Sequence, residues 1–172
     1  MSEATQQVTF SVSSILAGYE FSRGYMMKLL EDIPEEKMAT FSHGIVNHPA
    51  WQIGHLVTSG NYALEIAGHD RLVPDTWQEI FGIGSEPVED SSKYPSKAEL
   101  LEAYAAVHER VKEVLPQVDP ALLTAEVTDE GIREYFGTND LLLSFILGAH
   151  EGVHAGQLSA WRRSQGMPHV FG

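Results

Sequence analysis

The sequence contains no cysteine, few basic residues and no long apolar run, and each absence excludes a class of protein or site. Without cysteine the chain has no disulfide, no thiolate ligand and no thiol nucleophile, so any thiol chemistry must use a co-substrate. No apolar run reaches the roughly 18 residues of a membrane span, and we expect no membrane partner. The polar N-terminus MSEATQQ lacks the pattern of a signal peptide, which leads us to expect a cytoplasmic protein.

Basic residues are scarce relative to acidic ones, with 11 Lys and Arg against 24 Asp and Glu and a formal net charge of −13. Because a phosphate backbone is held by a basic surface, this charge excludes nucleic acid as an expected partner. The length of 172 residues and the hydrophobic fraction of 43% are typical of a globular protein with a substantial core. We expect residues 1–172 to form a single domain.

Four segments combine a helical spacing of apolar residues with recognisable ends. They span residues 11–33, 48–68, 96–116 and 138–165. Pro49 suits the first turn of the second helix, and Ser96 with Glu99 forms a capping box at the third. The connection 69–95 has no long period and would allow the second and third helices to run parallel. The pattern predicts an all-α protein, with residues 127–136 as a loop or weak hairpin.

Two histidines lie four residues apart in the last segment, within the stretch GAHEGVHAGQ. His150 and His154 share one face of the predicted helix with core residues, and His55 occupies a comparable face of the second helix. Buried imidazoles need polar partners or a metal, and three neutral imidazoles leave open positions for water or substrate. The other histidines lie near helix ends, in loops or in the C-terminal tail, except His108, which we expect to be partly exposed.

Alternatives to a three-histidine metal site exist. A single histidine on a core face is more often a hydrogen-bonded core residue than a ligand. The string HEGVH also matches the zincin pattern HExxH, in which the glutamate is a general base, but Gln157 and Ala160 stand where the longer metzincin pattern has Gly and His. Glu151 and Gln157 are candidates for orienting a ligand, and Trp51 and Tyr62 for lining a pocket.

Taken together, these segments resemble the DinB-like (also called YfiT-like) family of metalloenzymes. The residues that carry the resemblance are 47–56 (NHPAWQIGHL), 94–100 (YPSKAEL) and 150–158 (HEGVHAGQL). The resemblance implies a four-helix bundle in up-down-down-up order, with a long crossover between helices two and three. It implies metal ligands at His55, His150 and His154. It also implies a dimer and, for some members, thiol-dependent transferase or isomerase activity.

The preferred hypothesis is therefore an enzyme that uses a divalent metal, Zn²⁺ or Ni²⁺, and a low-molecular-weight thiol on a small-molecule substrate. The alternative is a non-catalytic module that the metal braces. A substrate-sized cavity at the metal would favour the enzyme, and a fourth position closed by a side chain would favour the module. We expect a homodimer through helix faces, because Met26, Met27, Leu29 and Leu30 offer more apolar surface than one helix face needs.

Overall fold

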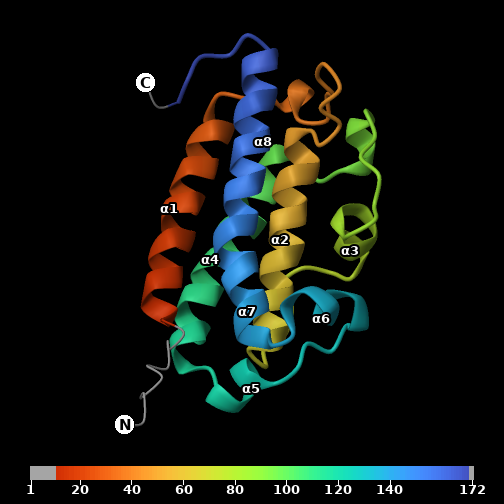
Figure 1. The fold of residues 1–172 in the computed structure, drawn as a ribbon. Helices are drawn as coiled ribbons and strands as arrows, with labels where there is room; N and C mark the ends of the chain where they lie inside the picture. Colours follow the sequence, from red (N-terminus) through yellow and green to blue (C-terminus); the bar gives the residue numbers. More distant parts are fainter. Residues whose placement is uncertain (1–10, 171–172) are drawn as a thin grey trace.

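The computed structural model describes residues 11–170, and these are helical with no strand among them (Figure 1). The all-α prediction is confirmed. Three of the expected long helices are α1 (Val12–Glu31), α2 (Pro49–Ile66) and α4 (Lys97–Val114). The fourth is composite and consists of α7 (Asn139–Ser144), the π-turn η4 (Phe145–His150) and α8 (Glu151–Ser164). The N-terminal heptapeptide that suggested the absence of a signal peptide lies outside the described residues.

The ends of the long helices follow the capping residues in the sequence. The Ser11 side chain accepts from the backbone N–H of Ser14 at α1, and His48 Nδ1 accepts from the Trp51 N–H at α2. Ser96 and Glu99 form both hydrogen bonds of the capping box at α4. These bonds satisfy backbone donors that the first turn of a helix leaves without an intrahelical partner.

The four long helices pack around one core. The composite helix contacts α1 and α2, and α4 contacts the same two helices. Helix α2 is the most buried of them, and Gly60 lets it approach closely, since a Cβ there would lie 2.4 Å from a side-chain carbon of Val107 on α4. Near the end of α8 the buried Arg162 pairs with Asp32 and donates to the Leu29 carbonyl, which fastens α8 to the end of α1.

Short helical elements occupy the connections. They are η1 (Glu35–Lys37), α3 (Thr76–Phe81), η2 (Ser91–Lys93), η3 (Leu115–Gln117), α5 (Pro120–Thr124) and α6 (Glu130–Phe136). The expected loop or hairpin at 127–136 is wrong, because this segment forms α6. Asp129 caps α6 by accepting from the Ile132 N–H, and Gly137 ends it with φ of +67°. In Figure 1, α3 and α6 both lie beside α2.

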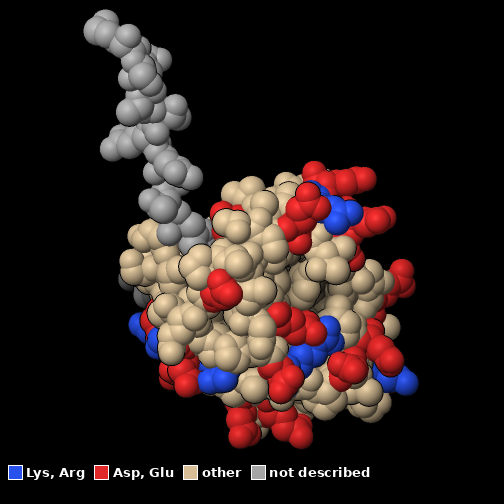
Figure 2. Space-filling model, turned by 90° about the horizontal axis from the view of Figure 1, so that it is seen from below, with Lys and Arg blue, Asp and Glu red and all other residues tan. Residues whose placement is uncertain are grey.

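Two surface expectations can be compared with the structure. Met26, Leu29 and Leu30 are buried in the core of the chain, so the surplus apolar surface expected on α1 is not at these positions. Acidic groups outnumber basic groups on the face in Figure 2, in keeping with the net charge of −13. Among the described residues, no helix has the length and apolar character needed to cross a membrane.

Candidate metal centre

The three predicted histidines meet inside the protein. His55 comes from the middle of α2, His150 from the end of η4 and His154 from the first turn of α8. The Nε2 atom of His150 lies 3.2 Å from Nε2 of His55 and 3.2 Å from Nε2 of His154. One ligand atom from each residue fits within a mutual distance of 4.8 Å, so the group could hold a metal ion.

The backbone turn before His154 contributes to this geometry. The sequence predicts one uninterrupted α-helix, whereas residues 145–150 form a π-turn. A π-turn shifts the residues before it around the helix axis relative to those after it, and such turns are common at functional sites. His150 is the last residue of the turn, and its ring stands at 90° to that of His154. The two rings therefore approach edge to face, with their Nε2 atoms directed at each other.

His55 is held in one orientation by neighbours from the long connection between α2 and α4. Its Nδ1 lies 2.6 Å from the carbonyl oxygen of Phe81, the last residue of α3. A carbonyl only accepts, so Nδ1 carries the proton and Nε2 keeps a free lone pair. The indole of Trp51 stacks on the imidazole at 4.7 Å with an interplanar angle of 8°, and its Nε1 donates to Ser85. Trp51 therefore supports a candidate ligand, and it is not among the residues that line the cavity beside His55.

Burial keeps the three imidazoles neutral. It lowers the pKa of His55, and it lowers that of His150 to about 4, with repulsion from His55 as the second cause. The pKa of His154 falls to about 3 through burial and then repulsion from the other two rings. Neutral imidazole is the form that binds a metal.

The chemistry of the donor set fits a divalent ion. Two nitrogens at about 2.0–2.1 Å from one tetrahedral ion lie about 3.3 Å apart, close to the separations at His150. Without a metal, hydrogen bonds between the rings satisfy the three Nε2 atoms less well. The His55 proton is on Nδ1, so its Nε2 atom can only accept. A proton on Nε2 of His150 or of His154 can be donated to only one neighbouring Nε2 atom, and the remaining Nε2 atom stays buried without a donor.

A cavity of about 990 Å³ reaches this cluster at His55. Its walls come from α2, from α3 with the residues after it, and from α6. The α2 wall presents His55, Thr58, Ser59 and Tyr62, which share one helix face at intervals of three and four residues. Tyr62, a candidate pocket residue from the sequence, lies in this wall. Thr58 and Ser59 were missed, although their spacing from His55 was a signal in the sequence.

The remaining candidates lie away from the three imidazoles. The buried Glu151 carboxylate turns to α4, where it accepts from the Tyr104 hydroxyl at 2.7 Å and pairs with His108 Nε2 at 3.0 Å. Gln157 accepts from the Asn47 amide at 3.1 Å, and no described contact joins it to the imidazoles. Neither residue orients a histidine of the cluster through a hydrogen bond in this structure.

His108 corrects a second expectation, because it is fully buried rather than partly exposed. Its ring stacks on Tyr19 at 3.7 Å and meets Tyr104 edge to face. Its partner Glu151, on a helix far away in the sequence, explains the burial of this polar ring. The core therefore contains a second polar group, formed by Glu151, His108 and Tyr104. It lies beside the three-histidine cluster but is separate from it.

Comparison with known proteins supports the resemblance of the motifs. No curated protein matches the chain significantly. The sequence model of the DinB superfamily matches residues 19–158, which include α2, α4, most of α1 and of the composite helix, and all three histidines of the cluster. The chain therefore belongs to the DinB superfamily.

Proposed function

We propose that this protein is a divalent-metal-dependent enzyme that acts on a small molecule, with His55, His150 and His154 as metal ligands. The observation that carries the proposal is the meeting of three imidazoles, one of which, His55, also lines a cavity of about 990 Å³. Cavities of roughly 300–1,000 Å³ are typical of small-molecule sites. The opening toward the cavity at His55 favours an enzyme over a module that the metal only braces.

The residues of the chain would prepare the site in three ways. The Phe81 carbonyl and the Trp51 ring hold His55 so that its Nε2 lone pair points at the other imidazoles. Burial keeps the ligands neutral, and the cavity admits a reactant on one side. A bound Zn²⁺ or Ni²⁺ would supply Lewis acidity, lowering the pKa of a coordinated water or thiol. The resemblance to the DinB-like family leads us to propose a low-molecular-weight thiol and a transferase or isomerase reaction, and because the chain has no cysteine this thiol would be a co-substrate.

The zincin alternative has no support in the position of Glu151. A general base must reach the proton that it removes. The Glu151 carboxylate is instead enclosed between Tyr104 and His108, on the side of α8 that faces α4. We therefore keep the non-catalytic module, and not a peptidase, as the second candidate.

The fold that we propose for this function is a single-domain four-helix bundle in up-down-down-up order, with residues 67–96 as the crossover. In Figure 1, α2 and α4 both lead from the end near η1 toward the end near α5, whereas α1 and α8 lead the opposite way. We also propose that the protein acts in the cytoplasm.

We propose a homodimer formed by the outer face of the composite helix. The exposed residues between positions 141 and 160 are all apolar or glycine, namely Leu141, Phe145, Ala149, Gly152, Val153, Gly156 and Ala160. An uncharged face is unusual on a chain of net charge −13. It is roughly 30 Å long and one helix diameter, about 10 Å, wide, which gives roughly 300 Å² per copy. Neighbouring helices would supply the rest of the roughly 600 Å² per copy that the smallest stable interfaces bury.

The enzyme proposal is tested with protein purified without an affinity tag. Thiol-transfer assays with a panel of electrophiles would be run on the metal-loaded and the chelator-treated protein. We expect turnover that requires the metal and is lost in His55→Ala, while His169→Ala, an exposed histidine in the tail, keeps it. Metal binding without turnover across the panel, together with a fourth protein ligand seen by X-ray absorption, would favour the non-catalytic module.

A further inference from the structure

The cavity beside His55 has walls of two chemical kinds. The α2 wall is polar and carries the hydroxyls of Thr58, Ser59 and Tyr62. The opposite wall, from α3 and α6, carries larger apolar side chains, which are Ile83, Ile132, Tyr135 and Phe136. A molecule that fills the space must therefore be apolar along one side and polar along the other.

The hydroxyls of the α2 wall are placed to accept hydrogen bonds. Thr58 and Ser59 each donate their proton to the backbone carbonyl of His55, at 2.9 and 2.8 Å. A hydroxyl whose proton is committed offers only its lone pairs to a ligand. This wall therefore favours a molecule that brings its own N–H or O–H donors.

Charge in and around the cavity is negative on balance. The one cation in the lining, Arg71, already pairs with Glu65 at 2.8 Å and with Asp75 at 3.2 Å. Asp129 adds a carboxylate to the lining from the start of α6. Burial, followed by the charges of Asp129 and Glu65, raises the pKa of Tyr62, so the field of Asp129 extends to the α2 wall. An anion in the cavity would meet the Asp129 carboxylate and a single guanidinium that Glu65 and Asp75 already pair.

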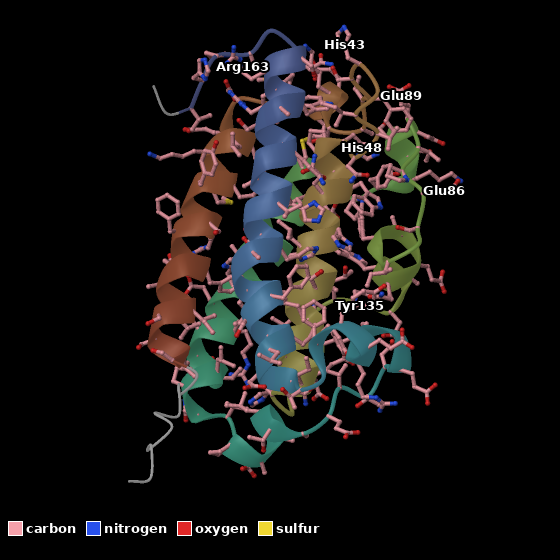
Figure 3. The ribbon with its side chains drawn as sticks, in the orientation of Figure 1. His43, His48, Glu86, Glu89, Tyr135 and Arg163 are labelled. Carbon is pink, nitrogen blue, oxygen red and sulfur yellow. The ribbon has the colours of Figure 1, made fainter. Side chains whose placement is uncertain are left out.

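Two large apolar side chains of the lining are open to solvent. Ile83 is 82% exposed and Tyr135 is 84% exposed. Figure 3 places Tyr135 between α6 and α3, the element that ends just before Ile83. Exposed apolar groups in the lining of one cavity are typical of surfaces that a ligand covers.

From these features we infer that the cavity takes an elongated, hydrophobic organic molecule that carries hydrogen-bond donors and no negative charge, with a hydrophobic amine as the preferred type. Its donors face Thr58, Ser59 and Asp129, and its apolar body lies between Ile83 and Tyr135. That this molecule is the substrate rests on the proposed function, whereas its binding depends on the cavity alone.

The test compares three probes with the same chain, octylammonium, octan-1-ol and octanoate, by isothermal titration calorimetry on the full-length protein before and after chelator treatment. On the chelated protein we expect octylammonium to bind at least about tenfold more tightly than octanoate, as one partly screened charge contact would give. Octan-1-ol should lie between them. Octanoate binding as tightly as octylammonium to the chelated protein would overturn the inference.

Two kinds of variant test which residues of the cavity cause the binding of the probes and the preference among them. Asp129→Asn keeps a good N-cap for α6 and should reduce the preference for octylammonium over octanoate severalfold, leaving octan-1-ol unchanged. Ile83→Ser and Tyr135→Ser should weaken all three probes, while Phe21→Ser, at a side chain 69% exposed on α1, should change none. Unchanged binding in both cavity variants would contradict the inference.

The metal proposal is judged separately, because metal content is measured on the same samples. A protein that holds no divalent ion but retains the charge preference of the chelated sample would refute the metal site and leave the cavity inference standing. A protein that holds the ion but binds no probe would support the metal site and refute the cavity inference.

Discussion

Replacing Glu151 should destabilise the fold strongly without removing a metal ligand. The side chain is 2% exposed, and its carboxylate accepts from Tyr104 and pairs with His108. In Glu151→Ala both partners would remain buried with no acceptor, at about 1–3 kcal/mol each, and a cavity would form. We expect a loss of about 3–5 kcal/mol in the free energy of unfolding, as is typical when one partner of a buried pair is removed.

Milder variants give a graded series. Glu151→Gln keeps the shape and one acceptor, and Tyr104→Phe removes a single hydrogen bond to a carboxylate, so each should cost about 1.5–3 kcal/mol. Glu130→Ala is the control, because the Glu130 side chain is 91% exposed, and a change within about 0.5 kcal/mol is expected there.

The assay is urea unfolding followed by circular dichroism, with metal content and peptide hydrolysis measured on each variant. Glu151→Gln should keep the metal and show no peptidase activity, as should the parent. Equal stability of Glu151→Ala and the parent would refute the role given to this network. Peptide hydrolysis that requires both the metal and Glu151 would restore the zincin interpretation.

Three further predictions concern other parts of the fold. Burial lowers the pKa of His48 to about 4, so the folded state resists a proton that the unfolded chain takes up near 6.5. The free energy of unfolding is therefore unaffected by this group above pH 6.5 and falls by about 3 kcal/mol as the pH drops toward 4. His48→Asn keeps the N-cap, and its urea midpoint should fall less over that range; parallel pH profiles would contradict this. A Cβ at Gly54 would lie 2.3 Å from the ring of Phe81, so Gly54→Ala should destabilise the fold by about 1–3 kcal/mol and weaken metal binding. Gly18→Ala, with open space around it, should do neither, and a neutral Gly54→Ala would refute the contact. Val153→Glu should give the mass of one 19.0 kDa chain in light scattering, against twice that mass for the parent, and a monomeric parent would refute the dimer.

The sequence predicted the long helices well because their signals are local. Ser96 and Glu99 lie within one turn of each other, and the apolar positions of each helix repeat at a fixed spacing. The pairing of His150 with His154 was predictable for the same reason. Their meeting with His55 was predictable only from the matching core faces, since 95 residues separate His55 from His150.

The parts that the sequence did not predict depend on contacts between distant segments. Nothing local to Phe81 indicates that its carbonyl will hold a histidine 26 residues earlier. Nothing local to His108 indicates a carboxylate 43 residues later, and without that partner a buried imidazole is unfavourable. The π-turn that ends at His150 was also missed, because its sequence has the same apolar spacing as an ordinary helix.

Helix α6 was missed for a different reason. Gly131 suggested a turn, whereas the Asp129 cap and the packing of Ile132 and Phe136 against the core favour a helix. The backbone bridge between Glu126 and Thr138 then closes the segment at its base. Since α6 supplies one wall of the cavity, the sequence alone could indicate the metal cluster but not the shape of the site beside it.

The central claim is that the three imidazoles hold a divalent metal, and metal content tests it most directly. The chain would be purified without an affinity tag, titrated with Zn²⁺ and Ni²⁺, dialysed and analysed by mass spectrometry of the elements. We predict one ion per chain in the parent and in His169→Ala, and affinity lower by orders of magnitude when His55, His150 or His154 is replaced by alanine. Equal metal content in the parent and in the variant that lacks all three would contradict the account.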